Sequence, residues 1–79
     1  MDINWEDLKI FYHAINEKSM NKAALKLKLT QPTLSRRLSE LEISIGESLI
    51  NRHTNGITPT SSGEKLFQHA RHIFEWSQD

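Results

Sequence analysis

The stretch SMNKAALKLKLTQPTLSRRLSELEISI, residues 19–45, decides how the rest of this 79-residue chain folds. Its apolar residues recur at helical spacing on either side of a short break, so it reads as two helices joined by a tight turn. Ser19 and Thr30 are good N-cap residues, which predicts helices over residues 20–27 and 31–45. The buried face of the second helix is expected to carry four residues that step by four, three and four: Leu34, Leu38, Leu41 and Ile45.

Positive charge gathers on the same stretch. Six of the ten Lys and Arg residues lie between positions 18 and 37, and no Asp or Glu interrupts this cationic window. They are Lys18, Lys22, Lys26, Lys28, Arg36 and Arg37. The formal net charge of the whole chain is zero. Because salt screens charges over about 8–10 Å, a local basic face can still attract a polyanion when acidic residues elsewhere cancel the sum.

Outward from this centre, the chain shows three further elements. Residues 5–17, capped by Asp2 or Asn4, carry one apolar stripe and predict an amphipathic helix. Residues 49–52 and 56–59 read as two short strands around an Asn-Gly turn signal. A long helix is expected from a cap at Thr60 or Ser61 to the chain end, with an apolar stripe that one small domain cannot fully cover.

These elements predict a mainly α fold, the winged helix–turn–helix. It has a three-helix core, a short two-stranded β wing and a long C-terminal linker helix. We expect the winged unit to occupy residues 1–60 and the linker or dimerisation helix residues 61–79.

Composition narrows the class of protein. There are no cysteines, which excludes disulfides and thiolate metal sites and fits a reducing, cytoplasmic setting. No apolar run approaches the ~20 residues of a membrane span, and the acidic N-terminus lacks the pattern of a signal peptide. A chain this short buries only ~60% of its unfolded surface, so a homodimer is the expected source of added stability.

A helix–turn–helix followed by a wing is a geometry that docks on DNA, with its second helix in the major groove. Gln31 can bond an adenine in two places, and Arg36 can do the same to a guanine. The ring of Pro32 or the methyl of Thr33 can pack on a thymine methyl, while Ser35 can reach a base or a phosphate. Lys22 and Arg37 are candidate phosphate contacts, and Thr30 is a cap whose phosphate contact would be secondary.

The residues that carry this organisation resemble the N-terminal winged helix–turn–helix of LysR-type bacterial transcriptional regulators, over essentially the whole chain. The resembling motifs are Ala23-Ala24, Gln31-Pro32-Thr33-Leu34-Ser35-Arg36, Leu41-Glu42 and Leu49-Ile50-Asn51-Arg52. The resemblance implies a homodimeric, sequence-specific DNA-binding domain that reads a partly palindromic operator. It implies major-groove contacts from Gln31, Pro32, Thr33, Ser35 and Arg36, and wing contacts from Arg52, His53, Thr54 and Asn55. It also implies pairing of two copies through the fourth helix, on the stripe of Leu66, Phe67, Ala70, Ile73 and Phe74.

The chain departs from the family pattern in the wing and in its length. Family members often have an arginine near the wing tip where this chain has Asn55, which should weaken a contact to a narrow minor groove. Pro59 and Ile50 replace commoner aliphatic and phenylalanine residues. The effector-sensing domain of the family is absent from this sequence, so an excised domain that binds no small-molecule effector is expected.

Two other classes of function stay open on the sequence. The first is a protein-interaction module that binds a partner helix through an exposed apolar stripe on the last helix, without specific DNA binding. The second is a small metal-dependent hydrolase, for which His69, His72 and Glu75 recur three residues apart. Ser35 beside Arg36 does not make up a nucleophile, an oriented base and a cleft, so we expect no enzyme, no catalytic residue, no metal and no cofactor.

Overall fold

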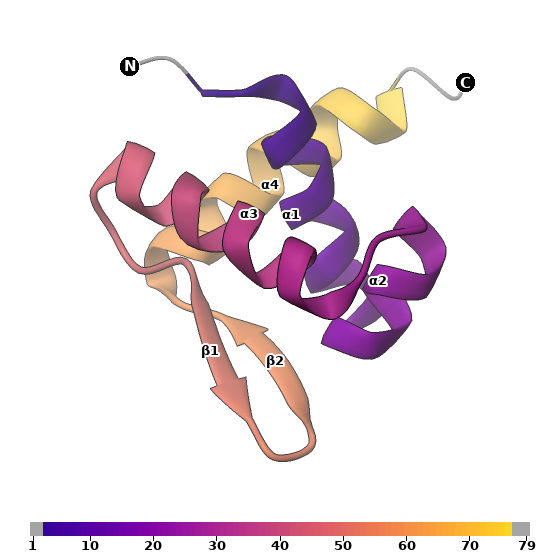
Figure 1. Cartoon of the computed structure of the whole chain (residues 1–79). Coiled ribbons are helices and arrows are strands. Elements are labelled where there is room, and N and C mark those ends of the chain that lie inside the picture. Colours follow the sequence, from indigo (N-terminus) through magenta and orange to yellow (C-terminus); the bar gives the residue numbers. More distant parts are fainter. Residues whose placement is uncertain (1–2, 77–79) are drawn as a thin grey trace.

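Four helices and one hairpin form the protein in the computed structural model, which describes residues 3–76 (Figure 1). In chain order they are α1 (Trp5–Glu17), α2 (Met20–Leu27), α3 (Gln31–Ile45), β1 (Ile50–His53), β2 (Gly56–Pro59) and α4 (Ser61–Trp76). The hairpin projects away from the helices, opposite the end where α1 begins and α4 finishes. The predicted winged helix–turn–helix is confirmed. The alternative cap at Asp2 and the helical continuation over 77–79 lie outside the described residues.

Side-chain caps start the helices where the sequence placed them. The Asn4 side chain accepts hydrogen bonds from two backbone N–H groups of α1, at 2.8 and 3.4 Å. Ser19 and Thr30 each accept one from the third residue of their helix, at 3.1 and 3.3 Å. Thr60, not Ser61, caps α4 by accepting from the backbone N–H of Gly63 at 3.0 Å. Because each cap satisfies donors that the helix cannot, the boundaries follow from local sequence.

The main core lies where α1, α2, α3 and the hairpin meet. Its large side chains below 2% exposure are Phe11, Leu34, Leu38, Leu41 and Leu49. Ala23 and Ala24 of α2 are also buried in it, which lets the neighbouring helices approach α2 closely. The three buried leucines of α3 hold that helix by one face and leave its opposite face outside.

A second cluster packs α4 against α1. Leu8, Tyr12 and Ala70 are buried there, with Leu66, Phe67 and Phe74 packed around them. α1 of the same chain therefore covers most of the apolar stripe of α4, while Leu66, Phe67 and Phe74 remain half-buried. Ile73 is the exception, with 39% of its surface exposed. Trp5 is 57% exposed, and its ring lies 5.4 Å from that of Phe74.

The wing is an antiparallel hairpin that pairs His53 with Gly56, leaving Thr54 and Asn55 as the loop. The Asn-Gly signal located the hairpin, but the loop comes one residue earlier than an Asn-Gly turn would. Gly56 has a φ of +146° and lies against Lys18, the C-cap of α1, where an added Cβ would collide with the Lys18 carbonyl oxygen. The Ile57 N–H also donates to that oxygen, at 3.2 Å. The wing is thereby attached to the end of α1.

β1 begins one residue later than predicted, at Ile50. The reason is that Leu49 uses its backbone groups elsewhere. Its N–H donates to the Glu42 carboxylate at 2.7 Å, and its carbonyl accepts from the Thr60 N–H at 3.0 Å. Within the described residues, no helix is both long and apolar enough to cross a membrane.

Candidate nucleic-acid interface

The first turns of α3 present the predicted base-contacting side chains outward. Gln31, Pro32 and Arg36 are exposed, while Thr33 and Ser35 are half-buried. The physical cause is the helical period, because the buried leucines of α3 occupy the opposite face. The structure thus brings all five predicted major-groove residues to one outward surface at the start of α3.

Neighbouring side chains hold three of these residues in place. The Gln31 amide nitrogen Nε2 donates to Asn21 Oδ1 at 3.3 Å. The amide keeps a second N–H and its carbonyl oxygen, which are the two groups that a bidentate contact to adenine uses. Ser35 Oγ accepts from Arg52 Nη1 at 2.9 Å, and Arg36 lies 3.3 Å from the Glu40 carboxylate.

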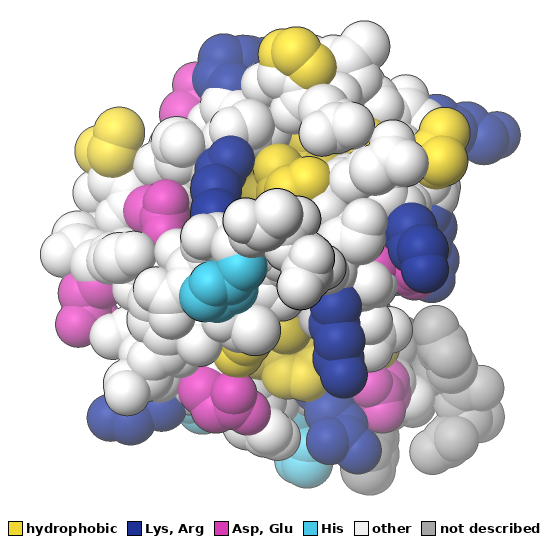
Figure 2. Space-filling view, turned by 90° about the horizontal axis from the view of Figure 1, so that it is seen from below, with side chains coloured by type: hydrophobic (Ala, Val, Ile, Leu, Met, Phe, Trp, Pro, Cys, Tyr) yellow, Lys and Arg dark blue, Asp and Glu magenta, His cyan; other side chains and the backbone are white. Residues whose placement is uncertain are grey.

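The cationic window is acid-free in the sequence but not in space. Carboxylates from outside it pair with three of its six cations: Lys26 with Glu17, Arg36 with Glu40 and Arg37 with Asp7. Figure 2, which views the molecule from the wing side, accordingly shows Lys and Arg side chains spaced among carboxylates rather than merged into one basic patch. The local basic face expected from the cationic window is therefore partly neutralised.

The Arg36–Glu40 pair is weak enough to be exchanged for a DNA contact. The two side chains are 61% and 52% exposed and lie four residues apart on one helix. Such exposed pairs contribute about 0.3–0.5 kcal/mol, whereas a bidentate arginine–guanine contact is worth about 1–3 kcal/mol. Arg36 can therefore leave Glu40 for a base at a net gain.

Arg37, also predicted as a phosphate contact, differs from Arg36 because its side chain is paired and half-buried within the protein. Its Nη2 lies 2.6 Å and its Nε 2.7 Å from Asp7 Oδ1 on α1. The side chains of Arg37 and Asp7 are only 25% and 12% exposed. Removing the arginine would leave a largely buried carboxylate unpaired, which is costly. Arg37 therefore joins α3 to α1.

The remaining predicted phosphate contacts lie at the start of α2 and α3. Lys22 is exposed on α2 and takes part in none of the ion pairs found among the described residues. The Thr30 hydroxyl donates to the Thr33 hydroxyl at 2.9 Å while it caps α3. Thr30 is thus engaged locally, and Lys22 is the freer of the two.

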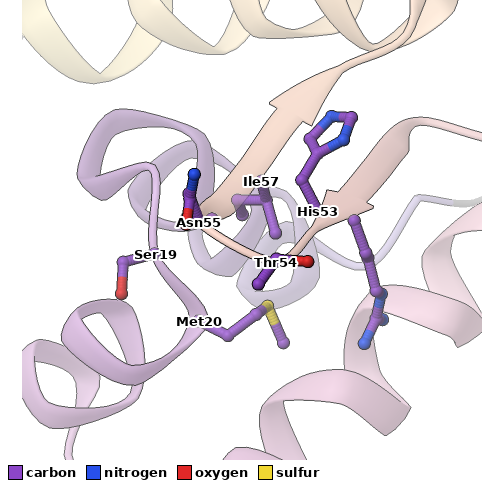
Figure 3. A pocket seen from close by; sticks show the side chains of 8 residues that line it. Ser19, Met20, His53, Thr54, Asn55 and Ile57 are labelled. Carbon is purple, nitrogen blue, oxygen red and sulfur yellow. The ribbon is translucent and has the colours of Figure 1, made fainter.

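The four predicted wing residues have different surroundings. Arg52 reaches across to Ser35 on α3, while the ring nitrogen Nε2 of His53 lies 2.8 Å from Thr58 Oγ1 on the neighbouring strand. Thr54 and Asn55 form the exposed tip. Between this tip and the start of α2 lies an open hollow of about 370 Å³, and in Figure 3 Met20 extends from α2 toward Thr54 across it.

Three supporting residues were missed by reasoning from the sequence. They are Asp7 and Asn21, to which the sequence pattern assigned no role, and Glu42, which entered only as part of the Leu41-Glu42 motif. Glu42 Oε2 accepts from the backbone N–H groups of Leu49 and Ile50, at 2.7 and 3.2 Å, and so ties the entry of the wing to α3. A lone acid after a buried leucine carries no sequence signal for such a contact, because its partners lie seven and eight residues away, at the end of a loop and the start of β1.

Of the three residues considered for a metal site, Glu75 has other partners. Glu75 accepts a hydrogen bond from the Tyr12 hydroxyl at 2.8 Å and lies 3.4 Å from Arg71 Nε. Burial, together with this bond to a carboxylate, raises the pKa of Tyr12. Glu75 therefore joins α4 to α1. His69 and His72 lie exposed on α4.

A capped helix–turn–helix, an outward first turn of α3 and a hairpin attached beside it define this chain as a winged helix–turn–helix domain. The family described as bacterial regulatory helix-turn-helix proteins of the lysR family matches residues 5–64. The chain belongs to this family.

The most informative relatives are regulators and DNA complexes. The chain is 37% identical over 71 residues to the nitrogen assimilation regulatory protein nac of Escherichia coli K12, covering 90% of this chain and 23% of that protein. It is 30% identical to the BenM DBD in complex with benA site 1 DNA, with a TM-score of 0.86 over 96% of this chain and 88% of that one. Oxidized OxyR of Corynebacterium glutamicum is 32% identical, with a TM-score of 0.87 over 99% of this chain and 24% of that one. The chain spans about a quarter of the length of the curated relatives it matches.

Proposed function

We propose that this chain is the sequence-specific, double-stranded-DNA-binding domain of a bacterial LysR-type transcription regulator. The observation that carries the proposal is the outward first turn of α3, where Gln31, Pro32 and Arg36 are exposed over a helix whose other face is buried. An α-helix fits the major groove, and its N-terminal residues are the ones that reach base edges. The DNA complexes of the BenM DBD and the CbnR DBD, both 30% identical to this chain, support the same role.

The roles divide between base reading and phosphate binding. Gln31, Ser35 and Arg36 read base edges, with Pro32 and Thr33 packing on thymine methyl groups. Lys22 and the wing loop bind the phosphate backbone on either side. Because Asn55 is uncharged, the wing tip reads the minor groove weakly. A bacterial DNA-binding regulator of this kind acts in the cytoplasm.

Two copies pair through α4 in this proposal, and the contact centres on Ile73. Four of the five predicted dimerisation residues pack largely against α1 of their own chain, whereas Ile73 is 39% exposed. A dimer places two recognition helices in successive major grooves about 34 Å apart, which suits a partly palindromic site.

The test is selection of bound duplexes from a random pool, followed by binding titrations at several salt concentrations. We expect a defined consensus, and an affinity that falls by about 0.9 log units per tenfold rise in salt for each phosphate neutralised. Arg36→Ala should lose about 1–3 kcal/mol of discrimination at one base pair, while Lys22→Ala should weaken all duplexes about equally. If no consensus emerges and binding is insensitive to salt, the proposal is wrong.

A further inference from the structure

The contact between Ser35 of α3 and Arg52 of the wing joins two elements that each face DNA under the proposed function. Arg52 Nη1 donates to Ser35 Oγ at 2.9 Å, between residues 17 positions apart in the sequence. This bond is a direct side-chain link from the wing to the base-reading face of α3. No ion pair among the described residues includes Arg52, so no carboxylate neutralises the guanidinium charge beside Ser35.

We infer that Arg52 is a positioning residue that makes Ser35 a hydrogen-bond donor toward DNA, and that the pair selects a base edge with an acceptor. This inference rests on the proposed function. A serine hydroxyl has one O–H donor and two acceptor lone pairs, whereas a guanidinium has donors only. Arg52 therefore occupies one lone pair of Ser35 Oγ, and its positive charge repels any second donor that approaches the oxygen. What Ser35 has left to offer is its proton.

That restriction has a consequence for sequence choice. In the major groove, guanine presents N7 and O6 acceptors, adenine presents N7, and thymine presents O4. Cytosine presents only its amino group, which is a donor. A Ser35 hydroxyl restricted to donating is satisfied by the first three edges and opposed by the fourth. The pair should therefore act mainly by rejecting cytosine at the base that faces Ser35.

The geometry also gives Arg52 a role that differs from a simple phosphate contact. A lysine on the same strand could neutralise a phosphate, but as a point charge it would not hold Ser35 in one orientation while binding elsewhere. The guanidinium has five donors, so Arg52 can hold Ser35 with one and keep others for the backbone. Arg52→Lys therefore separates the two roles, because it keeps the charge and removes the planar fork.

The experiment measures equilibrium binding of the wild type, Ser35→Ala, Arg52→Met, Arg52→Lys and the double variant Ser35→Ala/Arg52→Met. The probes are four duplexes that differ only at the base pair relaxed by Ser35→Ala in selection from a random pool. We expect Ser35→Ala and Arg52→Met each to lose about three- to tenfold of the discrimination against cytosine at that base pair. The double variant should lose no more than either single one. Arg52→Lys should keep most of the affinity for the preferred duplex and lose the discrimination.

Lys22→Ala is the matched control, because it removes one exposed cation that has no contact with Ser35. The pairing is overturned if Arg52→Met weakens all four duplexes equally, as Lys22→Ala should, or if the two single losses add in the double variant. It is also overturned if Ser35→Ala relaxes no base pair. Thermal unfolding by circular dichroism confirms that each variant folds. A wild type that selects no sequence would refute the proposed function, whereas selection without this coupling refutes only the pairing.

Discussion

Glu42 offers the sharpest test of how the wing is held to the recognition helix. Its Oε2 accepts from the N–H groups of Leu49 and Ile50, residues that are 1% and 7% exposed. A third contact, to the Ser48 hydroxyl at 3.5 Å, is too long to add much. Hydrogen bonds to a charged acceptor contribute about 1.5–3 kcal/mol each, and a buried N–H left without a partner costs about 1–3 kcal/mol.

Glu42→Ala removes both short bonds at once. Ser48 is exposed beside them, so water can reach part of the site, and we expect a net loss of about 2–4 kcal/mol. A 79-residue domain has a total stability of about 4–12 kcal/mol, so this is a large share of it. Urea unfolding followed by far-ultraviolet circular dichroism measures the change, and the melting temperature should fall by about 10 °C or more.

Two companion variants make the result specific. Glu40→Ala removes an exposed carboxylate from the same helix, where only the ion pair with Arg36 is lost, and should change stability by no more than about 0.5 kcal/mol. Glu42→Gln keeps a carbonyl oxygen of similar shape and should cost less than Glu42→Ala. If Glu42→Ala unfolds within about 0.5 kcal/mol of the wild type, the carboxylate does not anchor the wing and the reasoning fails.

Three further predictions concern the helical core. Arg37→Ala should destabilise the fold by about 1–3 kcal/mol by leaving Asp7 unpaired, while DNA affinity per folded molecule stays unchanged; a uniform loss of affinity without loss of stability in urea would return Arg37 to the phosphate contacts. Burial, with the charges of nearby lysines, lowers the pKa of His13 from its ordinary value of 6.5, and its Nδ1 is buried without a hydrogen-bond partner. The unfolded chain therefore takes up the proton first, so stability should fall as pH drops below 6.5, and urea titrations of His13→Gln should show a shallower fall than the wild type. Gly63→Ala should destabilise the protein, although alanine is favoured by about 1 kcal/mol within helices, because the added Cβ would collide with the Leu49 carbonyl oxygen; a stability gain in thermal unfolding would contradict this packing.

Some contacts in the structure differ from those expected from the sequence, and each difference has a physical cause. The stripe of α4 reads the same whether a second copy or α1 covers it, because periodicity reports that a face is buried and not what buries it. The same holds for charge. A window free of acids along the chain cannot reveal that Glu17, Glu40 and Asp7 lie beside its cations in space.

What the sequence determined by itself was local: helix starts at Asn4, Ser19 and Thr30, the hairpin near Asn55, and the outward face of α3. Caps, turn residues and helical period act over a few residues, so they can be read without coordinates. Only the tertiary structure decided which side chains stay exposed and which pair with one another. Arg36 and Arg37 are neighbours of the same chemistry, yet one is exposed and the other is held by Asp7, thirty residues away. Long-range packing makes that distinction, because the free energy of an arginine depends on what surrounds it after folding and not on its position in the chain.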